Sequence, residues 1–252
     1  MTLSTRRFGS AGLVLFAAAL MLTSMRVSAA PITGSFGFDG PGVLTFFDDG
    51  DFIDFCATVT GDTCNNNGSG EGDFTVTGPG TQSFTVLTNT TTGTIDDLTD
   101  TTPPAAGYTY LPVGIPVTIN EIIALNGFPT WNFQADLLPI ASCTGTTTQQ
   151  CLGAFQLDQN GPNVSVEVNI LGTLINTADG SKSTLDIALT GNFLETSIAA
   201  VAAGAVTPSG VFSDNWSASV TASAIPEPGT SGMMLLAGGC LLVFSRILRS
   251  RR

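Results

Sequence analysis

Alternation of apolar and polar residues recurs along this chain. Residues 164–170 alternate Val or Ile with Ser, Glu and Asn, and residues 184–190 and 216–222 repeat the pattern. Successive side chains of a β-strand point to opposite faces, so a period of two predicts strands with one face in a core and the other in water. The alternation therefore predicts a strand-rich domain.

Turn signals divide the chain into many short strands of this kind. Clusters such as Gly78-Pro79-Gly80, Asn126-Gly127 and Asp179-Gly180 separate the candidates, and such residues favour turns. Eleven or more short strands at this spacing predict an all-β, antiparallel β-sandwich or barrel. The other candidate strands span residues 34–38, 43–47, 52–59, 73–77, 82–87, 117–125, 131–138 and 153–159.

Two segments depart from the strand pattern. Residues 195–205 hold an alanine-rich run that predicts one short helix near the end of the domain, ended by Gly204, because Ala favours helices and Gly favours their C-terminal caps. The Thr-rich residues 88–104 give the weakest strand signal. We expect a mobile loop there, and any division of the domain would fall within it.

The first 29 residues have the features of a secretory signal peptide. Arg6 and Arg7 precede an apolar run over residues 11–22, and small residues follow up to Ala29. The apolar run is shorter than the ~20 residues that a membrane span needs. We therefore expect cleavage after Ala29 and a domain over residues 30–225 in an exported protein.

The last 27 residues, 226–252, combine a proline-rich break, an apolar run and a basic tail. Pro226-Glu227-Pro228 precedes an apolar stretch over residues 233–244. Counted over residues 230–248, the span is 19 residues, roughly 28 Å of helix, against a hydrocarbon core of about 30 Å. This order predicts a transmembrane helix whose basic end stays cytoplasmic, and a plain C-terminal anchor is the alternative reading. The basic residues are Arg246, Arg249, Arg251 and Arg252.

Together, these elements resemble the PEP-CTERM sorting signal of bacterial surface and secreted proteins. The resemblance covers about a tenth of the chain and none of the domain before it. It implies a membrane-embedded exosortase as partner, which is thought to cleave the signal, and a protein at the cell surface or outside the cell that is only transiently held in the membrane. It also implies association with exopolysaccharide.

Charge and composition exclude several functions. Residues 30–225 contain one basic residue, Lys182, and 19 acidic ones, a formal charge of −18. Without a basic surface, nucleic acid is excluded as a partner. The chain has no histidine, which removes Ser-His-Asp and Cys-His catalysis and His-ligated zinc.

Four cysteines in the exported domain predict disulfides. Seven residues separate Cys56 from Cys64, and seven separate Cys143 from Cys151. Local pairing within each pair is the simplest of the three connectivities, and the others remain open. Each local bond would close a loop of about 9 residues, worth roughly 2.6 kcal/mol in the chain-entropy model.

Clustered carboxylates around Gly50 form a candidate calcium site, and calcium is the only cofactor that the sequence suggests. Asp48, Asp49, Asp51 and Asp54 could ligate Ca²⁺ through oxygen. The spacing does not fit an EF-hand loop, and a solvated acidic face explains the same residues. A weaker candidate is the turn with Asp158, Asn160 and Asn163, which turn propensity also explains.

No motif in the domain indicates catalysis. None of its four glutamates lies beside an aromatic cluster typical of a sugar subsite, and Trp131 and Trp216 occupy strand patterns that place them in the core. We therefore expect a non-catalytic surface or extracellular-matrix protein. The alternatives are a carboxylate-dependent glycoside hydrolase of surface glycans and a calcium-dependent adhesion module.

Overall fold

A computed structural model of the chain describes residues 30–47, 52–55, 71–99, 102–104, 108–205 and 212–225. Most of these residues lie in strands. The structure also contains a short 3₁₀ helix, η1 (Gln82–Val86), and a short α-helix, α2 (Ile198–Ala205). The strands are β1 (Gly34–Phe47), β2 (Phe52–Phe55), β3 (Glu71–Val76), β4 (Thr92–Asp96), β5 (Leu98–Thr99), β6 (Thr109–Tyr110), β7 (Ile119–Leu125), β8 (Trp131–Leu137), β9 (Gln149–Leu152), β10 (Phe155–Asn160), β11 (Asn163–Asn176), β12 (Lys182–Phe193) and β13 (Phe212–Ala224).

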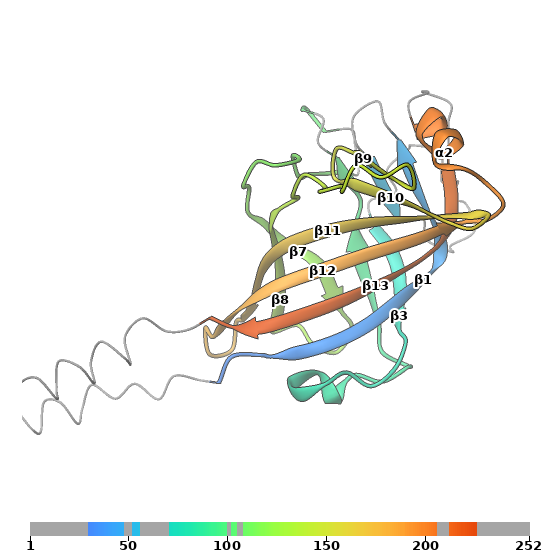
Figure 1. Ribbon diagram of the computed structural model, residues 1–252. Helices are drawn as coiled ribbons and strands as arrows, with labels where there is room; N and C mark the ends of the chain where they lie inside the picture. Colours follow the sequence, from blue (N-terminus) through green and yellow to red (C-terminus); the bar gives the residue numbers. More distant parts are fainter. Residues whose placement is uncertain are drawn as a thin grey trace, which may run out of the picture. The chain divides into compact units, whose positions relative to one another are not determined.

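Eight of these strands form a closed antiparallel barrel (Figure 1). Their order is β13-β12-β11-β8-β7-β4-β3-β1, and β1 then pairs with β13, from Gly34 opposite Ala222 to Phe46 opposite Phe212. The remaining strands extend the sheet: β2, β5 and β6 continue from β1, while β10 and β9 continue from β11. The predicted all-β antiparallel domain is confirmed, and the sheet closes as a barrel.

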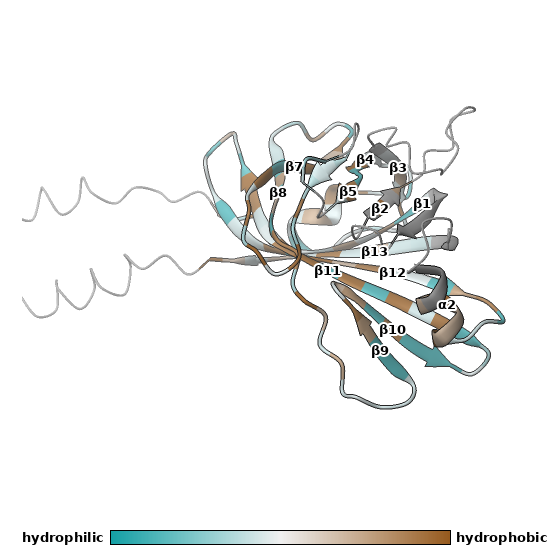
Figure 2. Cartoon of the chain, turned by 90° about the horizontal axis from the view of Figure 1, so that it is seen from above, coloured by the Kyte–Doolittle hydropathy of each residue, from teal (hydrophilic) through white to brown (hydrophobic). Residues whose placement is uncertain are grey.

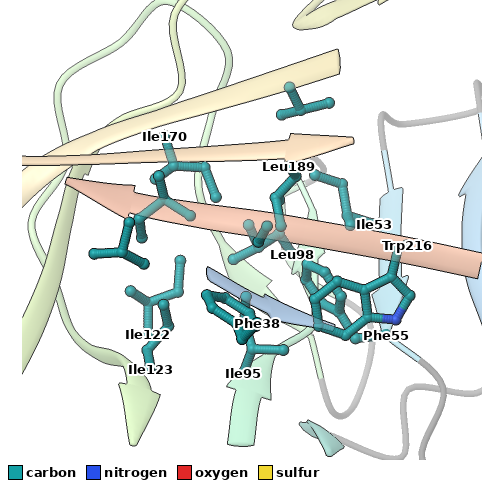
Figure 3. Packing of buried hydrophobic residues seen from close by; sticks show 14 of the residues in the cluster. Phe38, Ile53, Phe55, Ile95, Leu98, Ile122, Ile123, Ile170, Leu189 and Trp216 are labelled. Atoms are coloured by element: carbon teal, nitrogen blue, oxygen red, sulfur yellow. The ribbon is translucent and has the colours of Figure 1, made fainter. Parts of the chain in front are cut away.

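Alternate residues of the strands fill the barrel interior with apolar side chains. On β11 the buried set is the predicted one, Val164, Val166, Val168 and Ile170. Figure 3 shows how side chains from several strands meet around Phe38, Phe55 and Trp216. Burial of this alternating set is the main favourable contribution to folding, at roughly 25 cal/mol per Å² of apolar surface removed from water.

Trp216 occupies the core, as its strand pattern predicts. Its ring centroid lies 5.0 Å from that of Phe55 and 5.7 Å from that of Phe38, both nearly edge to face. Gly40 makes room for the indole, because a Cβ there would come within 2.2 Å of Trp216 Cζ2. The register of β1 against β13 shifts next to this point, between Asp39 and Val43.

The strand predicted over residues 82–87 is wrong, because the chain forms η1 there. Phe84 and Leu87 are both buried, and their spacing of three suits a 3₁₀ turn rather than a strand. The backbone N–H of Thr81 donates to Ser35 O (2.8 Å), and that of Ser83 donates to Thr33 O (2.9 Å). These bonds hold the segment against the start of β1.

The predicted loop over residues 88–104 is also wrong, because it contains β4 and β5. Strand β4 lies within the barrel between β3 and β7, and Ile95 and Leu98 are buried. The buried carboxylate of Asp97 accepts a hydrogen bond from the backbone N–H of Phe55 (2.8 Å), which ties β2 to this segment. Thr is a good strand former, so a high Thr content is compatible with a core strand and does not by itself indicate a loop.

The predicted helix near the end of the domain is confirmed as α2. Its first turn is capped from two sides. Ser197 Oγ accepts from Ala200 N (3.2 Å), and Gln159 Oε1 of β10 accepts from Ile198 N (3.0 Å). Gln159 Nε2 also donates to Thr196 O (3.1 Å), so one amide side chain joins the helix to the β10–β11 hairpin.

Two glycine-to-alanine substitutions, one at the contact and one in open space, test the close approach of β11 and β8. We expect Gly172→Ala to destabilise the fold by about 1–3 kcal/mol, because its Cβ would lie 1.9 Å from the backbone oxygen of Gln134. Gly78→Ala is the matched control, since a Cβ there meets nothing within 4 Å. Urea unfolding of both variants measures the difference, and equal stabilities would contradict this packing.

Candidate functional site

Most residues singled out by the sequence lie outside the described part of the chain. Among the residues that the structure does describe, no helix has the length and apolar character to cross a membrane, and no three His, Cys, Asp or Glu side chains gather as a metal site. Asp54 lies in β2, opposite Thr45 of β1. The sorting segment 226–252, Asp48, Asp49, Asp51, Cys56 and Cys64 lie outside the described residues.

One of the two predicted disulfides falls within the described residues and is present there. Cys143 is bonded to Cys151 with Cα atoms 5.8 Å apart, which confirms local pairing for these two residues. The bond joins the segment after β8 to β9, and Ala141 N donates to Gly153 O (2.9 Å) beside it. Among the described strands β9 pairs with β10 alone, so the crosslink fixes an edge of the sheet.

Next to this edge, outward-pointing polar residues gather on one surface, which we call the polar sheet face. The register places Gln156 of β10 opposite Glu167 of β11, Glu167 opposite Thr190 of β12, and Thr190 opposite Ser217 of β13. Figure 2 shows hydrophilic residues on the neighbouring β9 and β10. The polar sheet face consists of Gln149, Gln156, Asp158, Ser165, Glu167, Asn169, Thr190 and Ser217.

Asp158 is fixed at one side of this face by two amide donors. Gln149 Nε2 donates to its Oδ1 (2.8 Å) and Gln156 Nε2 donates to its Oδ2 (2.7 Å). Gln149 is held in turn, because its Oε1 accepts from the backbone N–H and the hydroxyl of Thr144. Asp158 thus takes part in an amide network on strand β10, while Asn160 and Asn163 pair at the hairpin end. Calcium binding at this turn stays a prediction.

Glu167 and the hydroxyl residues continue the network across the sheet. Asn169 Nδ2 donates to Glu167 Oε1 (3.0 Å), and the hydroxyls of Thr190 and Ser217 lie 2.9 Å apart. Carboxylates accept hydrogen bonds, whereas hydroxyls and amides both donate and accept. A surface with all three kinds of group suits a ligand that is itself covered with hydroxyls.

The two carboxylates of the face are diagonal neighbours. Asp158 lies two residues beyond Gln156, the partner of Glu167, and diagonal pairs on antiparallel strands are about 7–8 Å apart. That spacing is between the strand positions; inverting glycosidases hold the two carboxyl groups themselves about 6.5–9.5 Å apart, which this diagonal placement permits. However, the aromatic pair Phe128 and Trp131 lies at the β7–β8 turn, away from this face.

The alternating pattern gave part of the signal for this face. It identified residues 165, 167 and 169 as outward-pointing, but it did not show which strands lie beside them. The neighbours depend on register, and β12 and β13 reach β11 only through the strand order of the barrel. Strand β9, which brings Gln149 to the face, was not predicted.

Removal of the disulfide should weaken this edge of the sheet. We expect Cys143→Ala with Cys151→Ala to lower the free energy of unfolding by at most about 2.6 kcal/mol, the loop-closure contribution of a 9-residue ring. Urea unfolding measures the global effect, and hydrogen exchange at β9 measures the local one. An unchanged stability and unchanged exchange would contradict a structural role for the bond.

Comparison with known proteins adds no assignment to this geometry. No protein-family model matches the chain, and no curated protein or solved structure matches it.

Proposed function

We propose that the chain is a non-catalytic, exported protein of the cell surface or extracellular matrix that associates with exopolysaccharide. The observation that carries the proposal is the polar sheet face, a row of amide, carboxylate and hydroxyl groups on the outside of a barrel whose interior is filled with apolar side chains. Residues 1–29 and 226–252 support export and sorting to the cell surface.

The packed interior favours a ligand on the outer surface. Phe38, Phe55, Phe74 and Phe133 are fully buried among the strands, and aromatic side chains of this size fill the space that a ligand-binding barrel would keep open. The row from Gln156 to Ser217 crosses three strand spacings, about 14 Å at ~4.8 Å each. An extended oligosaccharide can lie along such a row.

The energetics of the face suit a polymer better than a small ligand. A hydrogen bond contributes only about 0.5–1.5 kcal/mol net, because it replaces bonds to water. One domain would therefore bind a short sugar weakly. A long polysaccharide that contacts many copies of the protein gains from multivalency, which suits a matrix component.

Export and sorting follow from the ends of the sequence. The signal peptide of residues 1–29 would direct the chain out of the cytoplasm. The Pro-Glu-Pro motif, apolar segment and arginine tail of residues 226–252 would then hold it in the membrane for an exosortase.

A glycoside hydrolase is the second candidate, because Asp158 and Glu167 have the diagonal placement described above. Each of these carboxylates already accepts an amide hydrogen bond, which fits a fixed binding surface. Calcium-dependent adhesion through Asp48, Asp49, Asp51 and Asp54 is a third proposal. Of these four residues, only Asp54 lies in the described part of the chain.

Affinity electrophoresis in gels that contain polysaccharide tests binding at the polar sheet face. The domain's charge of −18 repels acidic polymers, so we expect retardation by neutral polysaccharides without release of reducing ends. Glu167→Gln with Thr190→Val should weaken retardation several-fold, because it alters two neighbouring members of the row.

Thr184→Val is the matched control for this experiment. Thr184 and Thr190 both lie on the outer face of β12, and each donates its hydroxyl to a serine carbonyl of β13, at 3.1 and 3.3 Å. Equal losses in both variants would contradict a site at the polar sheet face. Release of reducing ends that stops in Asp158→Asn would instead support the hydrolase.

Intact-mass analysis of surface-extracted protein tests the sorting proposal. In a host that has the exosortase, we expect the mature chain to end near Pro226. A mass that includes Arg246, Arg249, Arg251 and Arg252 would show a plain membrane anchor.

A further inference from the structure

The first and last strands of the domain meet at one end of the barrel. Strand β1 begins and β13 ends there, with Gly34 opposite Ala222, and Figure 1 shows both ends together, away from α2 and the β9–β10 pair. Turns 126–130 and 177–181 lie at the same end, because Trp131 pairs with Asn176 and Ser183 pairs with Ala224. We call this region the terminal end.

The chain is held firmly where it enters the terminal end. Ser183 Oγ of β12 donates to Ile32 O, and both residues are buried. On the other side, Thr33 N donates to Ser83 Oγ (3.1 Å) and Ser35 N donates to Thr81 Oγ1 (2.8 Å), which attaches the same stretch to η1. The stretch 32–35 is therefore fixed to the barrel at the terminal end.

Few charged residues lie at the terminal end of a strongly acidic domain. The segments 30–33, 77–91, 126–130 and 177–181 contain a single charged residue, Asp179. The backbone N–H of Ser181 donates to Asp179 Oδ1 (2.8 Å) and lowers the pKa of that carboxyl. Lys182, the only basic residue between positions 30 and 225, comes directly after this turn and offsets its charge.

We propose that, before processing, the barrel stands on the lipid bilayer with its terminal end against an anionic membrane surface. The inference rests on the proposed function, in which residues 230–248 span the membrane. The new content is the identity of the surface that faces the lipid and the reason why the opposite end of the barrel projects outward.

The length of the connection excludes the inverted arrangement. Four residues, 226–229, separate Ile225 from the start of the proposed span, so the two are at most about 18 Å apart. Strand β12 has 12 residues, about 40 Å at ~3.3 Å each and roughly 30 Å along the axis of a tilted barrel. The end that carries the β10–β11 hairpin therefore cannot touch the membrane while Ile225 remains tethered.

Charge disfavours a barrel lying on its side. The next carboxylates lie about three to five residues up their strands from the terminal end, roughly 8–13 Å along the axis of a tilted barrel. They are Asp39, Asp73, Asp96, Glu121, Asp136 and Asp186. The Debye length at physiological salt is about 8 Å, so these groups lie about one Debye length or more from the lipid when the barrel stands upright. On its side, the barrel would press several of them against anionic headgroups.

The orientation has a consequence for processing. It keeps Pro226-Glu227-Pro228 within a few residues of the lipid surface and leaves the polar sheet face, toward the other end of β11 and β12, clear of the membrane. A membrane-embedded enzyme could then reach the motif while the barrel remains folded.

The two tryptophans of the chain provide the test, because they lie at different heights. Trp131 begins β8 at the terminal end and is half-buried against Phe128 and Phe84. Trp216 lies eight residues before Ala224 on β13, about 26 Å along the strand. With the full chain in phosphatidylcholine–phosphatidylglycerol vesicles, Trp216→Phe reports on Trp131 and Trp131→Phe reports on Trp216.

A lipid with a nitroxide on its headgroup should quench Trp131 at least twofold more than Trp216. Val86→Asp with Asn89→Asp, at the exposed surface of the terminal end, should reduce Trp131 quenching several-fold on these vesicles. Thr147→Asp with Asn160→Asp, which adds the same charge at the other end, should leave it unchanged. Vesicles of phosphatidylcholine alone should remove the difference between the two charge variants.

The outcomes separate this inference from the proposal on which it rests. If the full chain fails to float with the vesicles, the membrane segment is wrong, and the sorting proposal and this inference both fail. If it floats but the charge variants at the two ends change Trp131 quenching equally, only the orientation is overturned. Equal quenching of the two tryptophans would overturn it too, although the burial of Trp216 in the core by itself lowers its quenching. If a tryptophan variant does not fold, photocrosslinking of the unaltered chain by a headgroup-labelled lipid tests the orientation instead. Peptic peptides from residues 77–92 and 126–131 should carry the label, and those from 142–163 should not.

Discussion

Pairing between the first and last strands of the domain is the contact on which the barrel depends. Ten registered pairs between β1 and β13 close a ring of eight strands, and closure removes two exposed edges that would otherwise invite pairing with other chains. The two strands lie some 180 residues apart in the sequence, so this contact carries a large loop-closure entropy and has to form after most of the chain is present. The polar sheet face and the terminal end both follow from it, since β13 is brought beside β12 and β1 in the same step.

The outer surface divides into regions with different chemistry. The polar sheet face gathers amides, carboxylates and hydroxyls across β9 to β13, with each carboxylate held by an amide donor. The terminal end combines low charge with the half-buried Phe128 and Trp131. A hydroxyl-rich polymer suits the first surface and a lipid headgroup layer suits the second, so one domain can face the matrix and the membrane at once.

Alternation in the sequence predicted the strands whose apolar and polar faces are both clear, and the core positions of β11, β12 and β13 are confirmed. It failed where the sequence pattern of a segment does not match the position that the segment takes in the folded domain. Residues 82–87 have a strand-like composition but bury Phe84 and Leu87 three apart, and the Thr-rich stretch that contains Ile95 forms a central strand because its partners β3 and β7 supply the missing apolar surface. The local disulfide at Cys143 was predictable from spacing, whereas the row from Gln156 to Ser217 required the register of four strands.

Two long strands change partners halfway along their length. Strand β1 pairs with β3 at Phe38 and with β2 from Leu44 onward, and β11 pairs with β10 up to Glu167 and with β8 from Leu171 onward. The ring of eight is thus complete only toward the terminal end, while the distal halves of the same strands support hairpins that are not needed for closure. Such a division separates two kinds of sequence change. A lengthened β9–β10 hairpin would enlarge the distal surface without opening the ring, whereas an insertion within β7 or β8 would shift the register of the ring itself. Variation in what the domain binds can therefore accumulate at one end while its architecture is kept by the other.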